Sequence, residues 1–107
     1  MPLVNIYFAK NIERKIQDVT PTLKEFIAKE LTVDEITLTS QEISIRLLQN
    51  TGSYMIANVE LEITAHAFPQ RIKKQDEICI RVMNYIKENT GIDNKVWIKL
   101  SELGHSW

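Results

Sequence analysis

The chain has 107 residues, of which 44% are hydrophobic and 25% are charged, and its formal net charge is −1. This composition excludes a disordered or low-complexity chain, and the balanced charge argues against a nucleic-acid binder, which normally needs a basic excess. The single cysteine, Cys79, excludes an internal disulfide and a cysteine-rich metal site. No apolar run reaches the roughly 20 residues of a membrane span and no secretory leader is evident, so we expect a cytoplasmic protein with one domain over residues 1–107.

The first half of the chain is expected to form a strand, a helix and a second strand. Residues 3–8 place alternate apolar side chains on one face, which predicts a buried strand. The next segment carries apolar residues at steps of three and four, as an amphipathic helix does. Thr20-Pro21 matches an N-cap followed by proline, so one interpretation begins the regular helix only there. A strand is predicted over residues 36–48, with a bulge or bend near Ser40-Gln41, where the apolar face switches.

The second half repeats this order. A turn is expected at residues 50–53, and strict alternation over residues 55–65 predicts a strand that forms a long hairpin with the preceding one. A helix is predicted over residues 72–89, ended by Gly91, because glycine is favoured just past a helix end. Residues 95–100 predict the last strand. The order is therefore β-α-β-β-α-β.

The two halves resemble each other, with pseudo-repeats over about residues 1–48 and 54–107. Arg14 and Arg71 occupy matching places, each in a polar segment after a strand. A tandem β-α-β repeat predicts an α+β fold in which a four-stranded sheet carries both helices on one face, with parallel pairing inside each repeat. The other face of the sheet, expected to include Tyr7 and Trp97, would be broad and apolar, which predicts self-association.

The start Met1-Pro2, followed at once by an apolar strand and a duplicated β-α-β pattern, resembles the tautomerase superfamily, which includes macrophage migration inhibitory factor (MIF) and the carboxymethyl-hydroxymuconate isomerases. The likeness to the carboxymethyl-hydroxymuconate isomerases extends over most of the chain, through Asn11-Ile12-Glu13-Arg14, the long central strands and Arg71. The segment from Val59 through Phe68-Pro69-Gln70-Arg71, the second helix, and residues 97–103 are more similar still to an uncharacterised bacterial tautomerase-like family of unknown function.

This resemblance implies a cofactor-independent keto-enol tautomerase or isomerase of a small carboxylate. In active members the initiator methionine is removed and the secondary amine of proline transfers the proton, while arginines hold the carboxylate and the developing enolate. Carried to this chain, Pro2 is the catalytic base, Arg71 and Arg14 are the best matched substrate-binding residues, and Arg46 is a weaker candidate. The resemblance also implies a homo-oligomer, a trimer with its pocket between subunits, and no cofactor or metal.

The same residues also fit structural roles that involve no catalysis. Arg14 and Arg71 also suit solvent-exposed charges, Cys79 suits a buried inert thiol, and His66 and His105 lack the spacing of a metal site. The alternative function is a non-catalytic oligomeric binding or interaction protein of the same fold. A ferredoxin-like ligand-binding or regulatory domain shares the same order of elements, and only strand order and assembly distinguish it.

Overall fold

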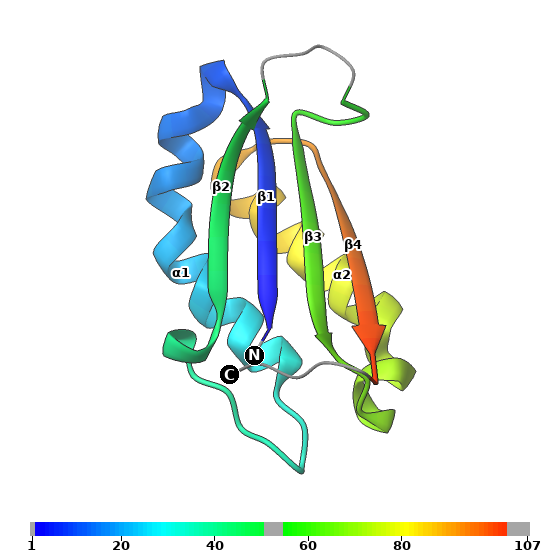
Figure 1. The fold of residues 1–107 in the computed structure, drawn as a ribbon. Helices are drawn as coiled ribbons and strands as arrows, with labels where there is room; N and C mark the ends of the chain where they lie inside the picture. Colours follow the sequence, from blue (N-terminus) through cyan, green and yellow to red (C-terminus); the bar gives the residue numbers. More distant parts are fainter. Residues whose placement is uncertain (1, 51–54, 103–107) are drawn as a thin grey trace.

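The computed structural model describes residues 2–50 and 55–102. These residues form two long helices and one sheet of four strands (Figure 1). The elements, with two short 3-10 turns, are β1 (Leu3–Ala9), η1 (Lys10–Ile12), α1 (Glu13–Leu31), η2 (Ser40–Glu42), β2 (Ser44–Asn50), β3 (Val59–His66), α2 (Pro69–Thr90) and β4 (Asn94–Ser101). The predicted turn at residues 50–53 lies mostly outside the described residues.

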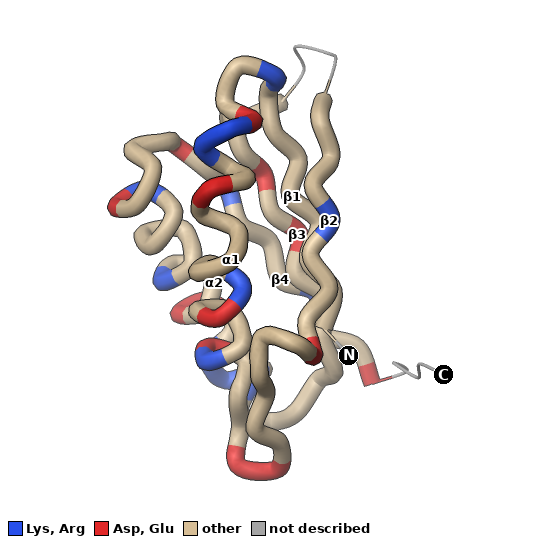
Figure 2. Tube along the Cα trace, turned by 90° about the vertical axis from the view of Figure 1, so that its left-hand side faces the viewer, with Lys and Arg blue, Asp and Glu red and all other residues tan. Residues whose placement is uncertain are grey.

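The molecule has two layers, with α1 and α2 side by side on one face of the sheet and the opposite face open (Figures 1 and 2). The strand order is β2-β1-β3-β4, with β1 parallel to β2, β3 parallel to β4, and β1 antiparallel to β3. Each repeat is thus a parallel β-α-β unit, and the two units join through their first strands. The predicted α+β architecture, including both helices on one face, is confirmed.

The core lies between the helices and the sheet. Alternation in the two central strands turns the apolar residues inward, where β1 contributes three buried side chains and β3 four: Val4, Ile6, Phe8, Val59, Leu61, Ile63 and Ala65. The helices meet them with stripes that include Ile16, Leu23 and Ile27 from α1 and Ile78, Val82 and Ile86 from α2. Burying such side chains stabilises the fold by roughly 1.5–3 kcal/mol each.

The predicted hairpin between the second and third strands is wrong. β1 lies between β2 and β3, which have no register with each other. Alternation records which face of a strand is buried and not which strand is its neighbour, so it cannot distinguish a hairpin from two strands that flank a third. The parallel crossover of each repeat decides the order, because it seats β2 directly beside β1.

The interpretation that begins the first helix at Thr20-Pro21 is also wrong, since α1 begins at Glu13 and carries Pro21 in its interior. Proline removes one helical hydrogen bond. Pro21 lies on the exposed side of α1, where water can solvate the carbonyl left without its donor. The buried stripe therefore outweighs the lost bond.

Two predicted strands are shorter in the structure. Residues 36–48 do not form one strand, because η2 interrupts the segment and β2 begins only at Ser44; this turn lies where the bend was expected. The third strand begins at Val59 rather than at 55, because residues 56–58 form a bend. Glu60 Oε2 holds this bend by accepting hydrogen bonds from the N–H groups of Ile56 (2.7 Å) and Ala57 (3.3 Å).

The second helix is longer than predicted, from Pro69 to Thr90, with Phe68 at its N-cap and Pro69 in its first turn. It ends as expected at Gly91, which adopts the left-handed conformation (φ 73°) and donates to the Lys87 carbonyl at 2.8 Å. Among the described residues, neither helix combines the length and the apolar character needed to cross a membrane.

Candidate functional site

The fold brings several chain segments together at one end of the sheet. Because β1 and β3 are antiparallel, the start of β1 lies beside the end of β3, with Leu3 paired to Thr64. Pro2 precedes β1, and its carbonyl accepts a hydrogen bond from the Ser44 N–H at the start of β2 (3.2 Å). The start of α2 and the loop between α1 and β2 reach the same end (Figure 1).

A small pocket of about 150 Å³ lies at this end. Its residues come from the N-terminus, the loop before β2, and the junction of β3 with α2: Pro2, Ile36, Leu38, Glu42, His66, Phe68 and Arg71. Pro2 is buried there, with the same strand parity as the inward-facing Val4. Of the four residues predicted from the sequence, the structure brings Pro2 and Arg71 into one pocket.

Arg71 is a buried cation, with an exposed fraction of 3%. Its Nε donates to the carbonyl of Leu31 at the end of α1 (2.8 Å), and Nη1 donates to the carbonyl of His66 at the end of β3 (3.1 Å). The guanidinium carbon lies 4.9 Å from the centre of the Phe68 ring, within reach of a cation–π interaction. Burial lowers the pKa of the Arg71 guanidinium from its ordinary value, but an arginine remains protonated in proteins.

This buried charge has no acidic partner within 4.0 Å in the described part of the chain, where the ion pairs found are Arg81–Glu30 and Lys87–Asp93. The negative end of the α1 dipole faces the cation through the Leu31 carbonyl, whereas the start of α2 adds a second positive field. A buried charge normally has a counter-ion. The arrangement therefore favours an anion that comes from outside the chain.

The remaining walls are two polar side chains and three apolar ones. Glu42 accepts hydrogen bonds through Oε1 from the N–H and the hydroxyl of Thr39 (3.0 and 3.1 Å), which caps η2 and holds the carboxylate at the pocket wall. The His66 ring packs edge-on against Phe68, with 4.6 Å between ring centres. The Phe68 ring therefore contacts both the imidazole and the guanidinium.

The other two predicted residues lie elsewhere. Arg14 is an exposed residue in the first turn of α1, at the far end of β1 from Pro2. The seven residues of β1 separate the two by roughly 23 Å at about 3.3 Å per residue. Arg46 is exposed on β2, opposite Asn5, and points out of the open face of the sheet. Within one subunit, neither lines the Pro2 pocket.

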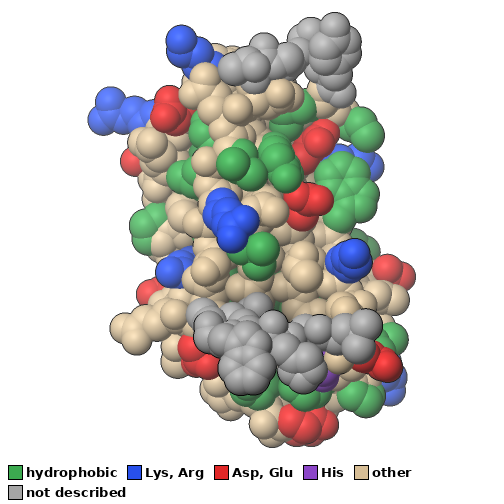
Figure 3. Space-filling model, viewed as in Figure 1, with side chains coloured by type: hydrophobic (Ala, Val, Ile, Leu, Met, Phe, Trp, Pro, Cys, Tyr) green, Lys and Arg blue, Asp and Glu red, His purple; other side chains and the backbone are tan. Residues whose placement is uncertain are grey.

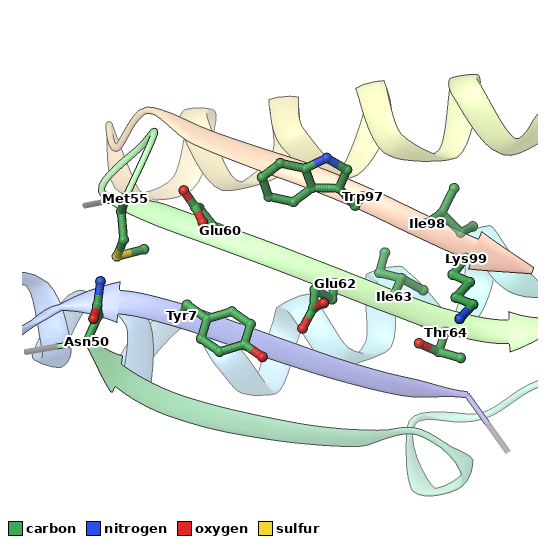
Figure 4. Close-up of a pocket in the computed structure, with 10 residues that line it drawn as sticks. All are labelled: Tyr7, Asn50, Met55, Glu60, Glu62, Ile63, Thr64, Trp97, Ile98 and Lys99. Carbon is green, nitrogen blue, oxygen red and sulfur yellow. The ribbon is translucent and has the colours of Figure 1, made fainter. Parts of the chain in front are cut away.

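A larger hollow of about 680 Å³ lies on the open face of the sheet (Figure 4). Tyr7, Glu62 and Trp97 line its middle, and the Glu62 carboxylate raises the pKa of the Tyr7 hydroxyl, mainly by hydrogen bonding. The open face was expected to be broadly apolar, yet acidic and basic groups are interspersed with the apolar ones (Figure 3). The alternation of β3 causes this, because its apolar residues all face the core and its polar residues, such as Glu60, face outward. None of the four predicted residues lines this hollow.

Sequence reasoning missed most of the walls of the Pro2 pocket. Ile36, Leu38 and Glu42 were assigned to a strand, and no local signal brings that loop to the N-terminus. A signal did exist for Phe68, because Pro69 in the first turn predicts a helix that starts there and places Phe68 and Arg71 one turn apart.

Comparison with known proteins identifies the fold of this chain through solved structures of low sequence identity. No protein-family model and no curated protein matches this sequence. Among solved structures, malonate semialdehyde decarboxylase matches with a TM-score of 0.70 and 9% identity, covering 98% of this chain and 92% of that one. The native Ps01740 structure matches with a TM-score of 0.65 and 14% identity, covering 94% and 95%. MIF2 of Leishmania major matches with a TM-score of 0.58 and 12% identity, covering 100% and 93%. The chain therefore has the tautomerase and MIF fold, as the resemblance implied.

Proposed function

We propose that this protein is a cofactor-independent keto-enol tautomerase or isomerase that acts on a small carboxylate in the Pro2 pocket. The observation that carries the proposal is Arg71: a guanidinium with 3% exposure, no acidic partner in the described residues, and a place in the same pocket as Pro2. The malonate semialdehyde decarboxylase of the same fold was solved both as wild type and with alanine in place of proline at its residue 1. This supports testing the N-terminal proline of the present chain in the same way.

Arg71 supplies the binding of the acid. Its hydrogen bonds to backbone carbonyls use Nε and Nη1, and the remaining N–H groups are suited to a carboxylate or an enolate oxygen. Charge-assisted hydrogen bonds of this kind are about twice as strong as neutral ones. They stabilise an enolate most, because the negative charge on its oxygen develops during the reaction.

Pro2 supplies the proton transfer once Met1 is removed. A proline nitrogen that follows another residue is an amide with no basic lone pair, whereas a terminal proline is a secondary amine. An ordinary terminal amine titrates at about 7.7–8.0, and both burial and a neighbouring cation disfavour its charged form. The neutral amine of Pro2 would take the proton from the carbon next to the carbonyl and return it to the enolate at oxygen or carbon. Met1 lies outside the described residues.

For the assembly, we propose a homotrimer joined through the open face of the sheet. That face exposes two large apolar side chains, Trp97 (46% exposed) and Leu48 (38% exposed), which a neighbouring copy would cover. It also carries the hollow of about 680 Å³, which could receive side chains of that copy. A fused 4-OT of the same fold (TM-score 0.55, 10% identity) is described as a symmetric trimer. Light scattering after size-exclusion chromatography measures the state, and a monomer at micromolar concentration would contradict the trimer.

The experiment that tests the activity begins with the intact mass of the untagged protein, which shows whether Met1 is removed. Exchange of the C3 protons of 2-oxobutanoate in D₂O, followed by proton NMR, then measures enolisation without any cofactor. We expect catalysed exchange that is lost in Pro2→Ala and kept in Pro21→Ala, a matched replacement on the outer side of α1. A retained Met1, or full activity of Pro2→Ala, would refute proline catalysis and favour a non-catalytic binding protein.

A further inference from the structure

We propose that the Pro2 pocket selects oxo acids of about three or four carbons with one carboxylate, and that Phe68 and Glu42 set this selectivity. The inference rests on the proposed function, in that it takes the pocket to bind a carboxylate at Arg71. It adds two limits, one on the size of the ligand and one on its charge.

The size limit follows from the volume and from the rigidity of the walls. One water takes about 30 Å³ in the liquid, so a pocket of about 150 Å³ holds roughly five to seven non-hydrogen atoms. This is well below the roughly 300–1,000 Å³ of pockets for larger ligands. A three- or four-carbon oxo acid fits, whereas an aryl-substituted acid needs one wall to move.

Phe68 is the wall that resists that movement. Its ring is held by the His66 imidazole at 4.6 Å and by the Arg71 guanidinium at 4.9 Å, and its backbone caps α2. Swinging the ring out would break both contacts at once. Ile36 lines the pocket from the loop before β2 and is exposed, and two backbone hydrogen bonds with Val33 (3.0 and 3.1 Å) fix its position in that loop.

Glu42 sets the charge limit. The pocket holds one buried cation and one carboxylate, and that carboxylate is fixed by the two hydrogen bonds from Thr39. An acid with one carboxylate pairs with Arg71 and presents an uncharged end to Glu42 and to the apolar walls. The second carboxylate of a diacid would meet the like charge of Glu42 or apolar side chains, and both are unfavourable. The other polar wall, the His66 imidazole, packs edge-on against Phe68.

The test measures binding of three acids to the full chain by isothermal titration calorimetry: 2-oxobutanoate, phenylpyruvate as the large monoacid, and 2-oxoglutarate as the diacid. We expect wild type to bind 2-oxobutanoate at least about tenfold more tightly than either of the others. Phe68→Ala should improve phenylpyruvate binding by about tenfold. Glu42→Gln should improve 2-oxoglutarate binding by about tenfold and leave phenylpyruvate binding unchanged, since the amide oxygen still accepts from Thr39.

Matched controls separate these effects from general ones. Glu60→Gln changes another carboxylate that accepts backbone N–H groups, on the open face of the sheet, and Phe26→Ala removes an aromatic ring that stacks on Tyr85 outside the pocket. Neither should change the order of the three affinities. Should Phe68→Ala fail to fold by circular dichroism, Ile36→Ala enlarges the same pocket from the loop and should improve phenylpyruvate binding in the same direction.

The outcomes distinguish this inference from the proposed function. Equal binding of all three acids by wild type would overturn the selectivity and leave the carboxylate site intact. Binding of 2-oxobutanoate in the expected order, without proton exchange, would support the selectivity and refute the catalysis. Absence of binding by every acid would overturn both.

Discussion

Two replacements of Arg71 test whether its guanidinium is the anion site. Arg71→Met and Arg71→Lys should rank in one order for the free energy of unfolding and in the opposite order for ligand affinity. Arg71→Met keeps a long flexible side chain and removes the charge, together with the hydrogen bonds to the carbonyls of Leu31 and His66. Each bond to a charged donor contributes roughly 1.5–3 kcal/mol, for a gross loss of about 3–6 kcal/mol. Removing a buried charge recovers several kcal/mol of desolvation. We therefore expect a net loss of about 1–3 kcal/mol for Arg71→Met.

Arg71→Lys keeps the charge without the planar fork that reaches both carbonyls. Its ammonium is more strongly hydrated than a guanidinium and is more costly to bury. Urea denaturation should therefore find Arg71→Lys at least as unstable as Arg71→Met. Calorimetry with 2-oxobutanoate should give the opposite order, with weakened binding in Arg71→Lys and a loss of about a hundredfold or more in Arg71→Met. Wild-type affinity in Arg71→Met would refute the assignment of this guanidinium as the anion site.

Three further predictions concern the scaffold and the lone thiol. Pro21→Ala should raise the free energy of unfolding by about 1–2 kcal/mol in urea denaturation. It restores a hydrogen bond in the interior of α1 and removes a residue that costs about 3 kcal/mol inside a helix. A lower stability would instead show that Pro21 shapes α1 for packing. Gly91→Ala should lower the thermal midpoint by about 4–8 °C. A side chain at φ 73° costs about 1 kcal/mol, even though no atom lies within 4 Å of the added Cβ. An unchanged midpoint would contradict the need for glycine in this left-handed cap. Burial, and then the charge of Asp76, raise the pKa of the Cys79 thiol. Iodoacetamide at pH 8 should therefore modify Cys79 more slowly than free cysteine, and modestly faster in Asp76→Asn than in wild type. Labelling of wild type at the rate of free cysteine would contradict this.

Local patterns in the sequence were sufficient for the elements of this fold. The apolar stripes of α1 and α2 and the alternation of β1 and β3 repeat with periods that only a helix or a strand can bury on one side. Gly91 marked the end of α2 for an equally local reason, because glycine is the residue that tolerates a positive φ. The α+β class and the placement of both helices on one face follow from these patterns and from the handedness of a parallel crossover.

The tertiary structure alone decided how the strands are ordered and which candidate residues meet. Arg14 and Arg71 occupy matching places in the two repeats, and the Phe68-Pro69 turn before Arg71 does not show which end of the sheet either arginine reaches. The antiparallel pairing of β1 with β3 brings Arg71 to the Pro2 end of the sheet and leaves Arg14 at the other. Glu42 and the loop before β2 reach the same pocket only because β1 lies between β2 and β3. Periodicity is a property of one segment, whereas a site at the ends of several strands depends on their order and direction.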